Sequence, residues 1–238
     1  MTRPLRIALC PHPPLLLREL CGATDSVPGL RTACRVAVAE LVGGQPGEVV
    51  VVGPADRSGP VDAGAAVDVR GFGTTGPRTA AGSALPQSLG VGSRLLQEVG
   101  WTGPVSFRAV ARDAEQRDLE QLAEELLGRP GVAVLLLGDG SARRGEKAPG
   151  FLDERAFPFD DAVADALASG DAATLRDLDT GLAEELMVDG RSVLRLLGLL
   201  GDRCGSVRAG LTHREDPYGV SYLVARWDLT RVVEPAPS

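Results

Sequence analysis

Apolar runs that break abruptly into polar turns recur along the chain. Residues 132–137, VAVLLL, are too few for an independent helix and rich in branched side chains, so they predict a strand buried on both faces. Residues 5–10 and 48–53 show the same pattern, and polar or charged side chains follow each run. Open α/β sheets bind ligands at the carboxyl ends of their strands. The pattern therefore predicts a site at such an edge.

Helical patterns alternate with these runs. Apolar residues recur at helical spacing over residues 30–41 and 113–127, and Asp113 with Gln116 forms a capping box for the second helix. Further helices are expected at residues 91–99, 159–167, 180–187 and 192–200, and strands at 105–110, 206–211 and 220–227. This alternation predicts an α/β fold with a central, mostly parallel sheet flanked by helices. Residues 60–90 have weak periodicity, with one short strand expected at 67–69.

Length and charge limit the class of protein. The chain has 238 residues, 44% of them hydrophobic, so we expect one α/β domain over residues 1–233 and a frayed tail at 234–238. A net charge of -7 argues against a nucleic-acid partner. Prolines interrupt the first apolar run, no run approaches a membrane span, and the cysteines lack paired spacing. We expect a cytoplasmic protein with a small-molecule ligand and no membrane partner; a homo-oligomer is left open.

The polar turn within residues 132–150 is the first candidate for the site. Asp139 and Ser141 are its candidate catalytic residues, and the backbone of the Gly-Asp-Gly-Ser turn offers N–H groups to an anion. The candidate ligand-binding residues are Arg143, Arg144 and Lys147, together with Tyr218 in the turn before the last strand. The alternative is a loop that neutralises itself through its acidic neighbours Glu146, Asp153 and Glu154.

Four motifs lie at predicted strands or strand ends. They are PHPP at residues 11–14, VVGPAD at 51–56, LLLGDGSA at 135–142 and EDPYGVSYLVARW at 215–227. In this order they resemble segments of the class III extradiol ring-cleavage dioxygenases of the catalytic B-subunit type and of the related Memo family. The resemblance spans most of the chain. It implies the B-subunit fold and an oxidoreductase that uses a divalent metal and acts on a small aromatic or anionic ligand.

The resemblance also implies a metal site. His12 carries over as the first ligand, Asp56 stands where the enzymes have a second histidine, and Asp189 lies where the Memo-like segment has its metal-site cysteine. Such a set suits Fe(II), Mn(II) or Zn(II), and no nucleotide cofactor is implied. Other candidate ligands are His213, Glu184 and Glu185. Alternatively, His12 only forms hydrogen bonds at its strand end while the two aspartates cap turns.

Ala142 stands where the family has its acid/base histidine. Because alanine cannot transfer a proton, the sequence argues against ring cleavage by the usual mechanism. Three functions are left open. The first is an extradiol dioxygenase-like, metal-dependent oxidoreductase, and the second is a non-catalytic ligand-binding or interaction protein that retains the fold. The third is a metal-assisted hydrolase in which Asp139 or Glu185 acts as the base.

Overall fold

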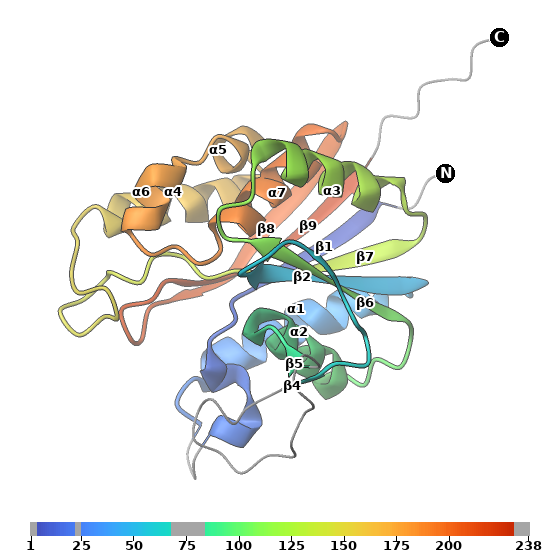
Figure 1. The fold of residues 1–238 in the computed structure, drawn as a ribbon, viewed down its shortest axis with the longest axis horizontal. Coiled ribbons are helices and arrows are strands. Elements are labelled where there is room, and N and C mark those ends of the chain that lie inside the picture. Colours follow the sequence, from blue (N-terminus) through green and yellow to red (C-terminus); the bar gives the residue numbers. More distant parts are fainter. Residues whose placement is uncertain (1–3, 22–24, 68–83, 231–238) are drawn as a thin grey trace.

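The computed structural model describes residues 4–21, 25–67 and 84–230. The main sheet has seven strands in the order β3–β6–β2–β7–β1–β9–β8 (Figure 1). Its four inner strands run parallel to one another and are β1 (Leu5–Cys10), β2 (Glu48–Ala55), β6 (Val105–Ala111) and β7 (Val132–Leu137). The outer strands, β3 (Gly59–Val61), β8 (Ser206–Glu215) and β9 (Tyr222–Thr230), pair antiparallel.

The antiparallel edges correct the prediction of a mostly parallel sheet. A parallel pairing needs a long crossover connection, but only a short turn separates β8 from β9, so these strands form a hairpin beside β1. The turn between β2 and β3 is shorter still, and β3 pairs antiparallel with β6. The fold is therefore α/β with a parallel core, and the four parallel strands are those that position the site.

Helices cover both faces of the sheet (Figure 1). One face carries α1 (Pro28–Gly43) and α2 (Gln87–Glu98). The other carries α3 (Gln116–Gly128), α4 (Ala156–Ser169), α5 (Ala172–Arg176), α6 (Thr180–Glu185) and α7 (Arg191–Asp202). Two single-turn helices, η1 (Pro14–Leu16) and η2 (Arg18–Leu20), follow β1, and β4 (Ala66–Val67) pairs with β5 (Ala84–Leu85) in a separate two-stranded sheet. None of the helices in these described ranges has the length and apolar character needed to cross a membrane.

Each face of the sheet has its own hydrophobic core. Successive strand side chains point to opposite faces, so Leu135 and Leu137 pack toward α1 and α2, whereas Val134 and Leu136 pack toward α3 and α7. Every residue of β7 is buried. This burial on both faces explains the uninterrupted apolar run and confirms the strand predicted at residues 132–137.

Some predicted boundaries were wrong. The capping box of Asp113 and Gln116 is absent because α3 begins at Gln116 after the N-cap residue Glu115, which makes no side-chain cap. Gln116 instead donates a hydrogen bond to Glu120 within the helix. Of the strand predicted at residues 67–69, only residue 67 lies in β4, and the rest falls outside the described residues, as does the predicted tail at 234–238.

Candidate functional site

The carboxyl ends of the parallel strands bring the site together. His12 follows β1, Asp56 follows β2, Arg112 follows β6 and Asp139 follows β7. Asp189 does not follow a strand but lies in the connection between α6 and α7. Because parallel strands end at the same sheet edge, residues far apart in the sequence become neighbours there.

His12 lies between two carboxylates. Its Nδ1 is 2.9 Å from Oδ2 of Asp139, and its Nε2 is 3.0 Å from Oδ2 of Asp189. The backbone N–H of His12 also donates to Oδ1 of Asp139, at 2.8 Å. The residue is only 3% exposed. Since an ionised carboxylate only accepts hydrogen bonds, the ring fits this position best with both nitrogens protonated.

The charges of these groups reinforce one another. Burial on its own lowers the pKa of His12, but the negative charges of Asp139 and Asp189 outweigh it and raise the pKa to about 9. Burial on its own raises the pKa of Asp189, but His12 and Arg112 outweigh it and lower the pKa to about 2. At neutral pH the cluster therefore holds a charged imidazolium beside an ionised Asp189.

Arg112 occupies the place expected for a metal ion. Its Nε contacts Asp189 and its Nη1 lies 2.9 Å from Oδ1 of Asp56, so a guanidinium bridges the two carboxylates. The described residues contain no group of three or more His, Cys, Asp or Glu side chains arranged to hold a metal ion. A divalent cation placed here would also be repelled by the charges of Arg112 and His12. The expected set of His12, Asp56 and Asp189 therefore does not fit a metal as it is arranged.

Close packing of Gly190 against Gly138 brings Asp189 within reach of His12. Gly190 packs against the turn after β7, where its N–H donates to the carbonyl of Asp139 at 2.9 Å. A Cβ on Gly190 would come within 2.7 Å of that carbonyl oxygen and 2.8 Å of the Cα of Gly138. Any larger residue would therefore push the α6–α7 connection away from the strand end.

Two cavities flank the cluster. The larger, here called the strand-end cavity, has a volume of about 910 Å³, and its charged lining residues are His12, Asp56, Arg57, Arg112 and Asp189. The smaller, here called the Tyr222 cavity, has a volume of about 510 Å³ and is lined in part by Asp139, Ala142, Glu184, Asp189, Arg191 and Tyr222. Asp189 lines both cavities. Basic side chains outnumber acidic ones in the strand-end cavity, whereas acidic side chains outnumber basic ones in the Tyr222 cavity.

Ser141 and Arg144 belong to a structural network instead of either cavity. Ser141 is 0% exposed, and its Oγ donates to Oδ2 of Asp160 at 2.5 Å while its N–H donates to Oδ1 at 3.0 Å. Nη1 of Arg144 lies 3.3 Å from the same carboxylate, and its Nε lies 2.6 Å from Asp216. Burial raises the pKa of Asp160. The network closes the loop after β7 onto α4.

The remaining predicted ligand-binding residues also lie outside the cavities. Arg143 is half-buried, and Lys147 and Tyr218 are exposed, but none of the three lines either space. Arg144 is neutralised by ion pairs within the protein, as the alternative for this loop predicts. Its partners, however, are Asp160 and Asp216 and not the acidic residues nearest in the sequence.

The other candidate metal ligands are dispersed. His213 on β8 pairs with Glu215 at 3.2 Å, and Glu185 pairs with Arg155 at 2.8 Å on the surface. Glu184 lines the Tyr222 cavity, as does Ala142, which the resemblance places at the acid/base position. Neither His213 nor Glu185 lines the strand-end cavity or the Tyr222 cavity.

Three residues of the site were not predicted. Arg112 follows β6 just as Asp56 follows β2, so the strand-end rule could have found it. Gln87, the first residue of α2, donates through Nε2 to the carbonyl of His12 at 3.1 Å. Tyr222 is buried against Asp139, and both the burial and that charge raise the pKa of its phenol. Neither Gln87 nor Tyr222 has a local sequence signal that separates it from an ordinary polar or aromatic residue.

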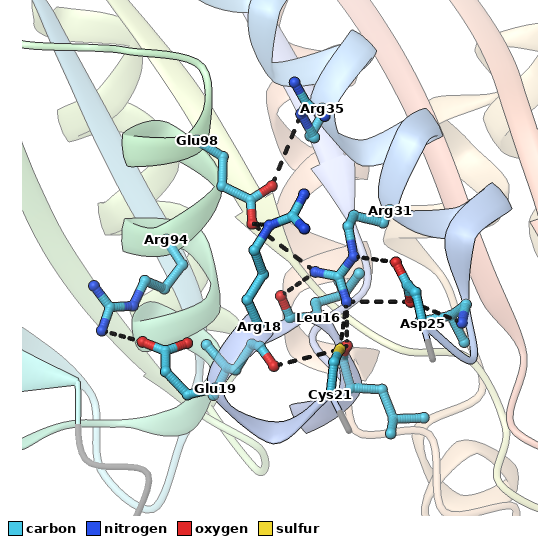
Figure 2. Close-up of polar contacts among 12 residues, drawn as sticks. Leu16, Arg18, Glu19, Cys21, Asp25, Arg31, Arg35, Arg94 and Glu98 are labelled. Carbon is cyan, nitrogen blue, oxygen red and sulfur yellow. Dashed lines mark hydrogen bonds and ion pairs between the residues drawn. The ribbon is translucent and has the colours of Figure 1, made fainter. Parts of the chain in front are cut away.

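A buried arginine supports the segment that follows His12 (Figure 2). The side chain of Arg31, on α1, is 4% exposed. It donates to the carbonyl of Leu16 at 2.6 Å, to the carbonyl of Leu15 at 2.7 Å and to Asp25 at 2.7 Å. Its Nη2 also lies 2.9 Å from Sγ of Cys21. Arg31 therefore fixes η1 and η2 against α1.

The same network reaches α2 (Figure 2). Glu98, at the end of α2, lies 2.9 Å from Nε of Arg18 and 3.9 Å from Nη1 of Arg31. Glu19 pairs with Arg94, one helical turn earlier on α2. These contacts join the segment that holds His12 to the helix that supplies Gln87.

The fold and site define an α/β protein with a parallel-cored sheet and an ionic cluster at its strand ends. No protein-family profile and no curated protein matches the chain. Among solved structures, the chain is similar to the uncharacterized protein JW3007 from Escherichia coli K12, with a TM-score of 0.53 and 14% sequence identity. The match covers 93% of this chain and 99% of that one. A likeness at this identity shows the fold alone.

Proposed function

We propose that this chain is a small-molecule-binding protein of the extradiol dioxygenase-like kind, whose site uses Arg112 as a built-in cation in place of a metal ion. The observation that carries the proposal is the guanidinium bridge from Asp189 to Asp56, at the strand ends where the resemblance expects a metal. His12 and Asp139 complete the cluster, joined by an ion pair and by the hydrogen bond from the backbone N–H of His12 to Asp139.

The strand-end cavity favours a small organic anion. Arg57 and Arg112 both line it, and Arg57 has no ion pair or hydrogen bond within the described ranges. The guanidinium of Arg57 offers bidentate hydrogen bonds to a carboxylate, and Arg112, although paired with Asp56 and Asp189, adds positive charge beside it. Apolar side chains of Val61 and Leu85 line the same space, and its volume of about 910 Å³ is ample for a single aromatic ring. We therefore assign a small carboxylate with an apolar body as the ligand class.

Benzoate titrations followed by ¹H–¹⁵N NMR test this assignment. We expect shifts at the amides of Asp56, Arg57 and Arg112, and binding about tenfold weaker in Arg57→Gln, because a charge-assisted hydrogen bond is lost. Arg117→Gln is the matched control, since Arg117 is exposed on α3 and has the same charge. Equal binding by wild type and Arg57→Gln, or no shifts at the strand ends, would overturn the proposal.

A metal-dependent oxidoreductase is the second candidate. Nε2 of His12 and Oδ2 of Asp189 lie 3.0 Å apart, and both residues line the strand-end cavity, so two ligands are in place if Arg112 leaves Asp189. Metal analysis of protein purified without chelators separates the candidates. Stoichiometric metal that is lost in His12→Ala supports the oxidoreductase, whereas negligible metal in both proteins supports Arg112 as the cation. Oxygen uptake with catechols and Fe(II) then tests ring cleavage directly.

A further inference from the structure

A third cavity lies at the opposite end of the sheet from the cluster. It has a volume of about 500 Å³ and lies between α1 and the strands β1, β9 and β8; we call it the hairpin cavity. Arg6, near the start of β1, lines it, whereas His12 follows the end of the same strand. At about 3.3 Å per strand residue, the two sites are about 20 Å apart along β1. The hairpin cavity is therefore separate from the strand-end site.

Three guanidinium groups from adjacent strands line the hairpin cavity. Asp228 on β9 lies opposite Arg208 on β8 and opposite Arg6 on β1, and Arg226 lies two residues before it on the same face. The alternation of strand side chains thus gathers Arg6, Arg208 and Arg226 on one side of the sheet. This concentration of cations stands out in a chain whose net charge is -7.

The carboxylates in the hairpin cavity leave one cation unpaired. Nε of Arg6 lies 3.9 Å from Asp228, and Arg226 contacts Glu40 on α1. The side chain of Arg208 lies outside these pairs and makes no ion pair or hydrogen bond in the part of the chain that the structure describes. The cavity therefore keeps one net positive charge, and its cations sit at a half-exposed rim where a ligand can reach them.

The base of the hairpin cavity is apolar and open. Ala37 and Leu41 of α1 line it and are buried in the protein, whereas the side chain of Ile7 packs in the core on the opposite face of the sheet. Gly210 lines the cavity opposite Arg226, and a Cβ there would meet nothing within 4 Å. The missing side chain keeps space above the strand, so a ligand can place an apolar body below the arginines.

We propose that the hairpin cavity is a second binding site, for a small organic phosphate with an apolar body. Guanidinium groups on three strands suit a tetrahedral phosphate, whose oxygens point in several directions, better than a planar carboxylate. The unpaired Arg208 supplies the attracting charge, and Ala37 and Leu41 contact the apolar part. This site is independent of the function proposed for the strand ends.

Phenyl phosphate, inorganic phosphate and phenol are the probes for ¹H–¹⁵N NMR titration of the full chain. Phenyl phosphate is expected to shift the amides of Arg208, Gly210 and Arg226, with an affinity that falls as salt is added. Inorganic phosphate should bind the same residues about tenfold more weakly because it lacks the apolar body, and phenol should leave them unshifted. Shifts from phenyl phosphate that are absent, or confined to the strand-end residues Arg57 and Arg112, would overturn the proposal while leaving the strand-end site to its own test.

Two variants and one control locate the contact. Gly210→Leu fills the open space without strain on the backbone, and Arg208→Gln removes the unpaired cation. Each is expected to bind phenyl phosphate about tenfold more weakly than wild type. Arg117→Gln, with the same change of charge on α3, should bind as wild type does. Amide spectra of the free variants establish that they are folded, and wild-type affinity in either folded variant would contradict the assignment.

Discussion

The charge on His12 is determined by its two aspartate neighbours. Because the pKa rises from 6.5 to about 9 on folding, the stabilisation by the imidazolium is fully present below pH 6.5 and is lost as the pH rises through about 9. For Asp189, whose pKa falls from 3.8 to about 2, the stabilisation is present above pH 3.8 and is lost as the pH falls through about 2. The cluster is therefore most stable in mildly acidic solution.

We predict that the free energy of unfolding decreases by about 3 kcal/mol as the pH rises from 6.5 to above 9, since each pKa unit corresponds to about 1.4 kcal/mol. Urea unfolding at a series of pH values measures this decrease. In His12→Gln, which cannot ionise, the decrease should be largely absent. The same pH dependence in both proteins would mean that another group is responsible.

At the level of elements, the α6–α7 connection depends on Gly190. In Gly190→Ala the new methyl group would press on the carbonyl of Asp139 and on Gly138, and such overpacking costs about 1–3 kcal/mol. Asp189 should then move away from His12, so an NMR titration of the His12 ring should give a lower pKa than in wild type. Gly128→Ala is the control, because a Cβ at Gly128 meets nothing within 4 Å. An unchanged His12 titration in Gly190→Ala would contradict this role.

The segment η1–η2 depends on Arg31 in a similar way. Arg31→Met keeps an unbranched apolar stem but removes the guanidinium and its hydrogen bonds to Leu15, Leu16 and Asp25, and we expect a loss of about 3 kcal/mol in unfolding free energy. The amide of Leu16, which donates to Pro13 at 3.0 Å, should exchange with solvent faster. Arg35→Met is the control, since the Arg35 side chain is 49% exposed and lies 3.8 Å from its partner Glu98. Similar effects in the two variants would argue against a specific role for Arg31.

The sequence predicts individual helices and strands better than it predicts which side chains the fold brings into contact. The sequence predicts the strand β7 correctly because burial on both faces leaves a continuous apolar run, and it predicts His12 at a strand end because proline follows it. The role of Arg112 depends on β6 pairing beside β2, which no local pattern encodes. The sequence does not reveal the structural role of Ser141, because its partner, Asp160, lies on a helix that only the fold brings near.

At the scale of the whole molecule, two cores share one sheet. Leu30 belongs to the core on the α1 face and Leu197 to the core on the α7 face, and replacing either by alanine should cost about 2–5 kcal/mol. Because the sheet joins both cores, we expect one cooperative transition in each variant, as a single domain over residues 1–233 requires. Trp101 and Trp227 pack against different cores, so variants with one tryptophan each report on one face. Separate urea midpoints for the two reporters would contradict a single domain.

At the strand ends, the positive charge between Asp56 and Asp189 comes from a side chain, Arg112, and so belongs to the polypeptide itself. A metal centre is loaded after synthesis, competes with cellular chelators and can change its oxidation state. Arg112 is present as soon as the chain folds, and its charge persists throughout the physiological pH range. On the proposed function, we therefore expect ligand binding at the strand ends to be the same in metal-starved and metal-replete cells.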